Sequence, residues 1–233
     1  MEDGRWKKIV LLFLLVQFAF SQSNKTLENK INDAIDTLVE NPTIESLNKI
    51  EIAEKSFVVK SNGEKLALVI LNCNKAFYQN QFGQTQKAIS SYEKAWQLYE
   101  KNKLSNYDIV ESCLKPLGNL YTIVGDYDNA ENIIKQYFYI ASIDKNSKQK
   151  AAAILNLSNV YQNTGKIDEA IILLEKTIKT EKLSSIEKGK LLSNLGNNYF
   201  LSKNYNKAEN AFELSVVELK KEASQSEMLF NSY

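Results

Sequence analysis

A pattern of apolar and small residues recurs three times in one register along the second half of the chain. Each copy places a Leu, a small residue and a Tyr on one helical face, and an Ala follows the Tyr nine residues later. The three pairs are Tyr121 and Ala130, Tyr161 and Ala170, and Tyr199 and Ala208. Because the apolar positions within each copy recur every three or four residues, the pattern predicts two successive helices joined by a short turn.

The predicted helix pairs need neighbours in order to be stable. A single hairpin buries too little apolar surface, so successive hairpins must stack into a continuous core. The small residues Gly118, Ser158 and Gly196 would allow two helices to approach closely. The sequence therefore predicts an all-α array of antiparallel helix pairs.

The repeated L-G-x-x-Y…A-x-x-x-F positions resemble those of the tetratricopeptide repeat (TPR). The resemblance implies a right-handed superhelical solenoid whose first helices line a concave groove. We assign residues 61–222 to four TPR-like hairpins. In the earliest of them, Tyr78 matches the repeated tyrosine only if the turn before Ala88 holds one extra residue.

The remaining segments flank this array. Residues 22–60 read as an N-terminal helical cap or a degenerate repeat, with helices over 23–40 and up to about Phe57, separated by Asn41 and Pro42 as cap and first helical residue. Residues 223–233 read as a tail or as the start of a further repeat. An open C-terminal end would also permit weak self-association. Within the array, Pro116 is expected to kink its helix.

Residues 1–21 have the pattern of a signal peptide. Arg5, Lys7 and Lys8 precede an apolar run over 9–20, and residues 19–21 form a small-x-small cleavage site. We expect an exported protein, periplasmic or secreted, with no integral membrane association after cleavage. An uncleaved anchor is the alternative, although about 12 apolar residues are short for a membrane span.

Composition and charge narrow the choice of partners. The chain has 233 residues, 44% of them hydrophobic, with 8 Gly and 2 Pro, which suits a helical array. Its net charge is +1, and it becomes zero without residues 1–21, so nothing favours binding to nucleic acid or anionic lipid. Cys73 and Cys113 either pair or are buried thiols.

The sequence offers little that could carry catalysis. It contains no His, which removes the most common general base and metal ligand. It also lacks the glycine-rich loops that bind nucleotide phosphates. We therefore expect a non-catalytic protein without cofactor or metal, whose partner is a protein or a peptide.

The predicted groove carries a row of asparagines. Asn119, Asn159 and Asn197 occupy the same position in three repeats, two residues after the Leu. An Asn side chain both donates and accepts hydrogen bonds, so this row could hold an extended peptide backbone. The alternative is that these are ordinary solvated residues.

The groove residues also resemble the dicarboxylate clamp of co-chaperone TPR domains, which holds a C-terminal carboxylate with Lys, Asn, Asn, Lys and Arg. Four positions match, namely Lys115, Asn119, Asn156 and Lys190. Asn194 stands where that family has Arg, and an amide cannot replace a permanently charged, bidentate guanidinium.

A second resemblance concerns the signal, the Asn41-Pro42-Thr43 segment and the run from Lys115 to Tyr121. Together they are similar to the N-terminal TPR array of bacterial proteins that end in a CHAT (caspase-like) domain. This resemblance implies a recognition or regulatory arm of a longer effector whose catalytic domain is absent from this sequence.

Overall fold

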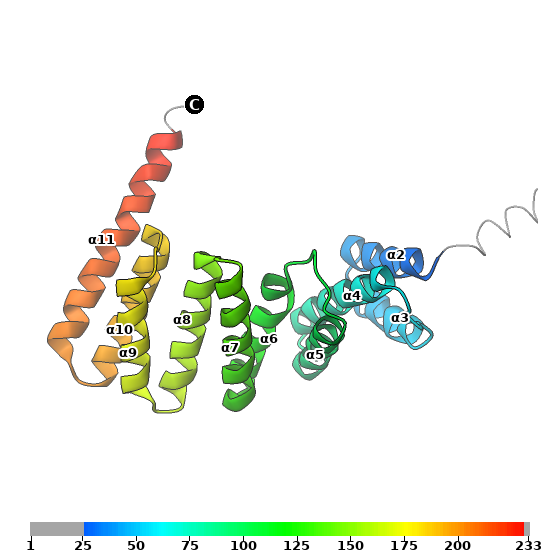
Figure 1. Cartoon of the computed structure of the whole chain (residues 1–233), viewed down its shortest axis with the longest axis horizontal. Coiled ribbons are helices and arrows are strands. Elements are labelled where there is room, and N and C mark those ends of the chain that lie inside the picture. The colour runs from blue at the N-terminus through cyan, green and yellow to red at the C-terminus, as the bar shows by residue number, and fades with distance from the viewer. Residues whose placement is uncertain (1–25, 231–233) are drawn as a thin grey trace, which may run out of the picture. The chain divides into compact units, whose positions relative to one another are not determined.

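The computed structural model describes the backbone of residues 26–230 and the side chains of residues 26–221. All regular elements in this part of the chain are helices (Figure 1). They form two compact units that divide after Asn106. None of the helices within residues 26–230 is long and apolar enough to cross a membrane. The predicted signal peptide, 1–21, lies outside the described residues.

The described residues of the first unit, 26–106, form four helices. They are α2 (Leu27–Glu40), α3 (Ile44–Glu54), α4 (Asn62–Gln81) and α5 (Thr85–Lys101). The core of this unit joins Ile31 and Leu38 of α2 to Leu47 of α3 and Leu71 of α4. The two helices predicted within 22–60 are therefore present and pack on the first hairpin.

The helix starts in this unit differ from the predicted ones. Thr43, and not Asn41, caps α3, because the Thr43 side chain accepts a hydrogen bond from the Ser46 amide at 3.0 Å. Ser61 and Glu64 form a reciprocal capping box that starts α4 at Asn62.

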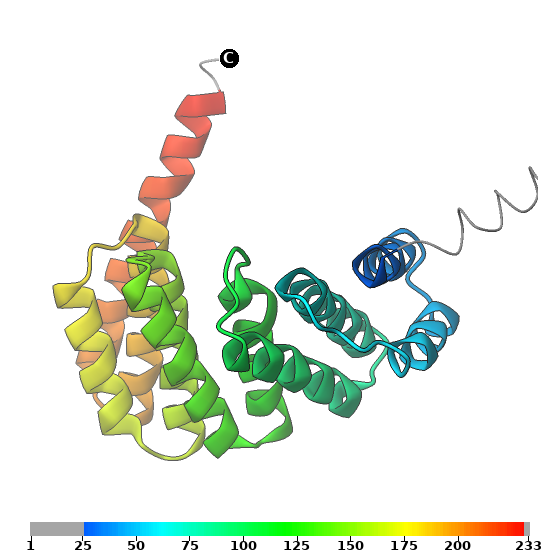
Figure 2. The ribbon, with the colours of Figure 1, turned by 45° about the vertical axis from the view of Figure 1, so that its right-hand side comes forward.

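The described residues of the second unit, 107–230, form three helix pairs. Its elements are the π-helix η1 (Val110–Leu114), α6 (Lys115–Val124), α7 (Tyr127–Ile143), α8 (Ser147–Asn163), α9 (Ile167–Thr180), α10 (Ser185–Leu201) and α11 (Tyr205–Phe230). Consecutive helices pack against one another as antiparallel neighbours (Figure 2). Leu174 and Leu191 are fully buried at the centre of a cluster that joins the last two pairs. The final helix continues through 223–230, part of the segment 223–233 that the sequence suggests as a tail or as the start of a further repeat.

The small residues of the repeat allow close packing, as predicted. A Cβ atom added to Gly118 would lie 3.0 Å from Ile134, and one added to Gly196 would lie 2.7 Å from the Phe212 ring. Ser158, at the same position in the middle repeat, is fully buried. Gly118 and Gly196 each lie where the first helix of a pair meets the second.

The turn of the first hairpin has the same length as the other three. A residue with positive φ stands five positions before the framework Ala in every hairpin: Gly83, Gly125, Gly165 and Lys203. The Gln84 amide donates a hydrogen bond to the Gln79 carbonyl oxygen at 2.8 Å. In the other hairpins the acceptors of the equivalent hydrogen bond are the carbonyl oxygens of Tyr121, Tyr161 and Tyr199. The extra residue expected in this turn is therefore absent, and Gln79, not Tyr78, occupies the tyrosine position.

Pro116 does not kink a continuous α-helix. The chain forms the π-turn η1 before it, and Pro116 lies in the first turn of α6. A proline is tolerated there because the first amides of a helix have no partner inside it. At the start of this segment, the Asp108 side chain accepts a hydrogen bond from the Glu111 amide at 3.0 Å.

Cys73 and Cys113 are both buried thiols, and no disulfide joins them. This structure therefore agrees with the second of the two alternatives that the sequence leaves open. Each thiol contributes a small apolar group to the core of its own unit.

Candidate functional site

One face of the second unit is formed by the first helices of its pairs. On this face α8 contacts both α6 and α10, whereas α7, α9 and α11 approach one another far less closely. Because the first-helix layer is the more tightly spaced of the two, the unit curves toward it. The predicted groove residues of α6, α8 and α10 therefore lie on the inner side of the curve.

The structure joins four of the predicted asparagines into two bridges between repeats. The Asn156 side chain donates to Oδ1 of Asn119 at 2.7 Å and links α8 to α6. The Asn194 side chain donates to Oδ1 of Asn159 at 2.8 Å and links α10 to α8. We call these two bridges the amide ladder.

The orientation of the Asn159 amide follows from its neighbours. Nδ2 of Asn198 donates to the backbone carbonyl of Asn194 at 2.8 Å and also faces the side-chain Oδ1 of Asn194 at 3.1 Å. Since Asn194 Oδ1 accepts, Asn194 Nδ2 must donate to Asn159 Oδ1. The Asn159 amino group remains without a hydrogen-bond partner among the described residues.

Ser158 and Asn198 support the ladder, although the sequence did not indicate either as a site residue. The Ser158 hydroxyl lies 2.7 Å from Oδ1 of Asn194. Both side chains are fully buried beneath the groove. Asn194 and Asn198 are four residues apart on a helix and therefore share one face, which is the signal that could have found Asn198.

Other predicted residues take no part in the ladder. Lys115 forms an ion pair with Glu111 of the preceding turn, with 2.7 Å between Nζ and Oε1. Lys190 and Asn197 are exposed and have no ion pair or hydrogen bond within the described part of the chain. Asn194, at the arginine position of the clamp, uses its side chain inside the protein. The clamp residues therefore do not converge as a ready-made carboxylate site.

A hollow of about 390 Å³ opens beside the first bridge of the ladder. Its walls contain Asn119, Asn156 and Asn159 together with Thr122 and Ile123 of α6. Ile123 is 75% exposed, which is high for a large apolar side chain. The hollow therefore combines amide groups with an apolar surface, a combination typical of sites that bind an extended peptide.

A buried tyrosine supports the hollow from behind. The Tyr137 side chain of α7 is fully buried, and its hydroxyl lies 3.4 Å from the Ala152 carbonyl of α8. Burial raises the pKa of Tyr137 well above its usual range, and the Asn156 side chain beside the hydroxyl opposes this rise. Tyr137 is therefore a neutral hydrogen-bonding group at any ordinary pH.

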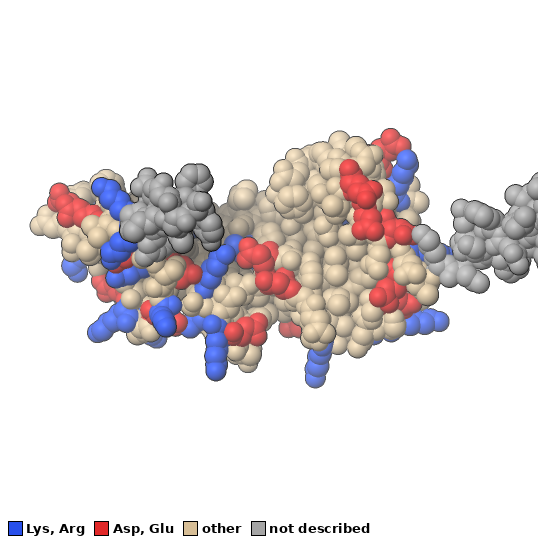
Figure 3. Space-filling model, turned by 90° about the horizontal axis from the view of Figure 1, so that it is seen from above, with Lys and Arg blue, Asp and Glu red and all other residues tan. Residues whose placement is uncertain are grey.

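The charged side chains of the second unit include both positive and negative groups. Lys and Asp or Glu side chains neighbour one another over the second unit in the view of Figure 3. Within the described residues, no group of three or more Cys, Asp or Glu side chains could hold a metal ion. The chemistry that this groove offers is hydrogen bonding and apolar contact.

Comparisons with known proteins agree with this architecture. The tetratricopeptide repeat family matches residues 151–184. No match is found among curated protein sequences.

Solved structures match over most of the chain. A putative kinesin light chain with TPR-like repeats from Podosopora anserina is 18% identical, with a TM-score of 0.63, and the match covers 84% of this chain and 94% of that chain. MamA from Desulfovibrio magneticus RS-1 is 12% identical, with a TM-score of 0.58 and coverages of 84% and 97%.

A further similar structure is Bacillus thuringiensis PlcR in complex with the peptide PapR7 and DNA. It is 13% identical, with a TM-score of 0.53, and the match covers 88% of this chain and 74% of that chain. These likenesses confirm the predicted all-α TPR solenoid class. Residues 151–184 are therefore a tetratricopeptide repeat, and the chain has the fold of tetratricopeptide-repeat proteins.

Proposed function

We propose that this protein is a non-catalytic scaffold that binds an extended peptide segment of a partner protein on the groove formed by α6, α8 and α10. The observation that carries the proposal is the amide ladder beside the hollow at Ile123. The fold supports it, because PlcR, which shares this fold, was solved in complex with a peptide.

The ladder leaves hydrogen-bond donors facing the groove. The Asn159 and Asn119 amino groups have no partner within the described residues, while their carbonyl oxygens accept from Asn194 and Asn156. Outward amino groups suit the backbone carbonyl oxygens of a peptide, which are present whatever its sequence. Ile123 adds apolar surface for one side chain of the peptide.

Selection from a library of random linear peptides tests this proposal. The chain from Gln22 is immobilised, and the affinities of enriched peptides are then measured by fluorescence anisotropy. We expect the Asn119→Ala, Asn159→Ala double variant to bind these peptides about thirtyfold more weakly, since two hydrogen bonds contribute roughly 1 kcal/mol each.

The matched control replaces two exposed asparagines of the second-helix layer, Asn132→Ala and Asn210→Ala. We expect the control to bind within about twofold of the unchanged protein. Circular dichroism must show that both variants are folded. Equal affinities for the two double variants would contradict binding at the ladder.

We further propose that the protein is exported, to the periplasm or beyond the cell. The support is the basic and apolar pattern of residues 1–21. Mass spectrometry of the protein recovered from its own cells tests this, and we expect the chain to begin at Gln22. Recovery of the intact N-terminus in a membrane fraction would support the anchor instead.

A second candidate role is the regulatory arm of a longer CHAT-like effector. The observation that favours it is a set of exposed apolar side chains on α11: Leu214, Val216, Val217 and Leu219. Such a surface suits the packing of a further repeat. Reading the gene beyond the codon for Tyr233 tests this role, because it requires more repeats and a domain containing Cys and His.

The same α11 surface suits weak self-association. Light scattering that shows a rise of mass with concentration, abolished by Val217→Lys, would assign the surface to a second copy of the chain. A constant mass for both proteins would exclude self-association there.

A further inference from the structure

The first hairpin has polar residues where the other three have apolar ones. With Gln79 at the tyrosine position, Lys75 falls at the position of Leu117, Leu157 and Leu195. Ser91 likewise falls at the position of Ile133, Leu173 and Ala211. All three polar side chains are buried, with exposures of 2% for Lys75, 2% for Gln79 and 4% for Ser91.

Hydrogen bonds connect these residues to one another and to α3. Lys75 forms an ion pair with Glu54. Gln79 donates to Oε1 of Glu51 at 2.9 Å and accepts from the Ser91 hydroxyl at 2.8 Å. Burying a polar group costs free energy unless it forms a hydrogen bond or an ion pair, and Lys75, Gln79 and Ser91 each form at least one.

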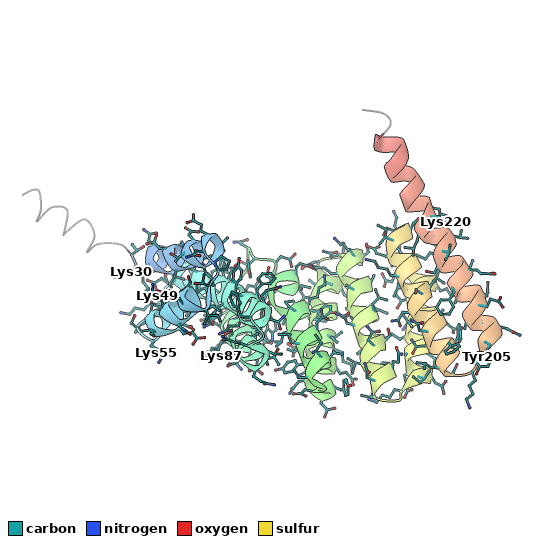
Figure 4. The ribbon with its side chains drawn as sticks, turned by 180° about the vertical axis from the view of Figure 1, so that it is seen from behind. Lys30, Lys49, Lys55, Lys87, Tyr205 and Lys220 are labelled. Atoms are coloured by element: carbon teal, nitrogen blue, oxygen red, sulfur yellow. The ribbon has the colours of Figure 1, made fainter. Side chains whose placement is uncertain are left out.

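A cavity of about 440 Å³ opens over this network between α3, α4 and α5. It is lined by Glu51, Glu54, Lys55, Lys75, Gln79, Lys87, Ser90, Ser91 and Lys94. Lys55 and Lys87 lie on the same edge of the first unit in Figure 4. The lining contains four lysines and two glutamates, and therefore carries a net charge of +2.

The two glutamates are already engaged. Glu54 pairs with Lys75, and Glu51 pairs with Lys87 at 3.3 Å. Lys55 and Lys94 have no ion pair or hydrogen bond within the described residues, so they supply the surplus charge. Burial lowers the pKa of Lys75, Glu54 opposes this, and the nearby Lys94 lowers it further. An anion in the cavity would relieve this repulsion.

We propose that this cavity binds a phosphate monoester group through Lys55 and Lys94, with the hydroxyl group of Ser90 as a further ligand. A phosphate monoester carries a charge of about −1.5 to −2 at pH 7, which matches the surplus of +2. Lysine binds phosphate as a point charge, whereas a carboxylate is matched better by the fork of an arginine. The site lies in the first unit, so it goes beyond peptide binding at the ladder and does not rest on it.

A purely structural role for the buried polar network would not explain why Lys55 and Lys94 lie over the cavity. The ion pair of Lys75 with Glu54 and the bonds of Gln79 satisfy the buried groups without help from the rim. Lys55 and Lys94 add nothing to that network, yet they lie over the same cavity. Their placement is explained by a ligand and not by the internal bonds.

Nuclear magnetic resonance titration of the ¹⁵N-labelled chain from Gln22 tests the site at constant ionic strength. The probes are inorganic phosphate, acetate, a short phosphoserine peptide and its unphosphorylated form. We expect saturable shifts on α3 and α5 with the two phosphate-bearing probes only. Tighter binding of the phosphopeptide would identify a phosphorylated partner as the source, and equal or tighter binding of inorganic phosphate would identify a small phosphate.

Each lysine would form one exposed ion pair with the phosphate, and such a pair changes affinity by up to about fivefold. The variant Lys55→Gln, Lys94→Gln removes two such pairs and should weaken phosphate binding about tenfold. Both lysines are exposed, so the fold should persist. The matched control is Lys176→Gln, Lys179→Gln on α9, which removes the same charge and should change the affinity by less than twofold. Equal weakening by both variants, or shifts that do not saturate, would overturn the proposal.

Discussion

The Tyr199 hydroxyl links two of the repeats and makes the free energy of unfolding depend on pH in the alkaline range. The Tyr199 hydroxyl donates to Glu175 of the preceding repeat. Burial, and then the bond to Glu175, raise the pKa of Tyr199 to about 12. The unfolded chain releases this proton near pH 10. The stabilisation is therefore fully present below about pH 10 and is lost as pH rises through about 12.

We expect Tyr199→Phe to reduce the loss of stability at alkaline pH. Urea unfolding at pH 8 and at pH 11 gives the free energy of unfolding of both proteins. The loss of stability between the two pH values should be smaller for the variant, because its hydroxyl can no longer ionise. An identical loss in both proteins would show that Tyr199 does not contribute.

Another local feature is the fit between Gly196 and Phe212. A Cβ at 196 would lie 2.7 Å from the ring, which forces the ring to move. We expect Gly196→Ala to destabilise the protein by about 1 kcal/mol, since overpacking outweighs the gain in helix propensity. In the middle repeat, the positions equivalent to Gly196 and Phe212 hold Ser158 and Leu174, so a residue with a Cβ stands opposite a Leu there. In a Phe212→Leu background, Gly196→Ala should therefore be neutral or stabilising. Urea unfolding of the four proteins checks this.

The sequence predicted the groove asparagines but not their bonding. Helical periodicity places Asn119, Asn159 and Asn197 on one face. The bridges depend instead on the distance between neighbouring repeats, which brings Asn156 to Asn119 and Asn194 to Asn159. That distance is set by packing and cannot be read from spacing along the chain.

Among the helices, α10 has a start that can be tested directly. The Ser184 hydroxyl accepts from the Glu187 amide at 3.2 Å, and the Glu187 carboxylate accepts from the Ser184 amide at 2.8 Å. We expect Ser184→Ala to lower the free energy of unfolding by about 1 kcal/mol. Hydrogen exchange should show faster opening of the first turn of α10, and Ser185→Ala, just inside the helix, serves as the control.

Helix existence was easier to predict than helix ends and register. The apolar stripes correctly indicated every helix pair of the array. Tyr78 was aligned with the repeated tyrosine because both are aromatic. The hydrogen bond from Gln84 to Gln79 in the turn instead places Gln79, one residue later, at that position. The π-turn before Pro116 was missed because an extra residue in a helical turn leaves no sign in the periodicity.

The division of the chain into two units predicts two unfolding transitions. Trp96 is the sole Trp after residue 21 and lies in the first unit, where it stacks on Tyr99. That unit has Lys75 and Gln79 at core positions that are apolar elsewhere, and buried ion pairs stabilise less than packed apolar groups. We expect urea to change Trp96 fluorescence at a lower concentration than it changes most of the circular dichroism. Coincident transitions would show a single cooperative unit.

The sequence alone suggested one continuous array and not two units. The repeat spacing runs on without a long linker, so nothing in the apolar pattern marks a boundary at Asn106. The break coincides with the irregular segment that precedes η1, where Asn106 has a φ of 64°. The position of a division between compact units follows from the tertiary packing within each unit, which spacing along the chain does not encode.

The amide ladder has a consequence for how neighbouring repeats respond to an occupant. Hydrogen bonds in a chain polarise one another, so a carbonyl oxygen that accepts from Asn159 makes the Asn159 oxygen a better acceptor for Asn194. The contact between α8 and α10 is then strengthened by the same event that fills the groove. Binding and stiffening of the second unit would in this way occur together.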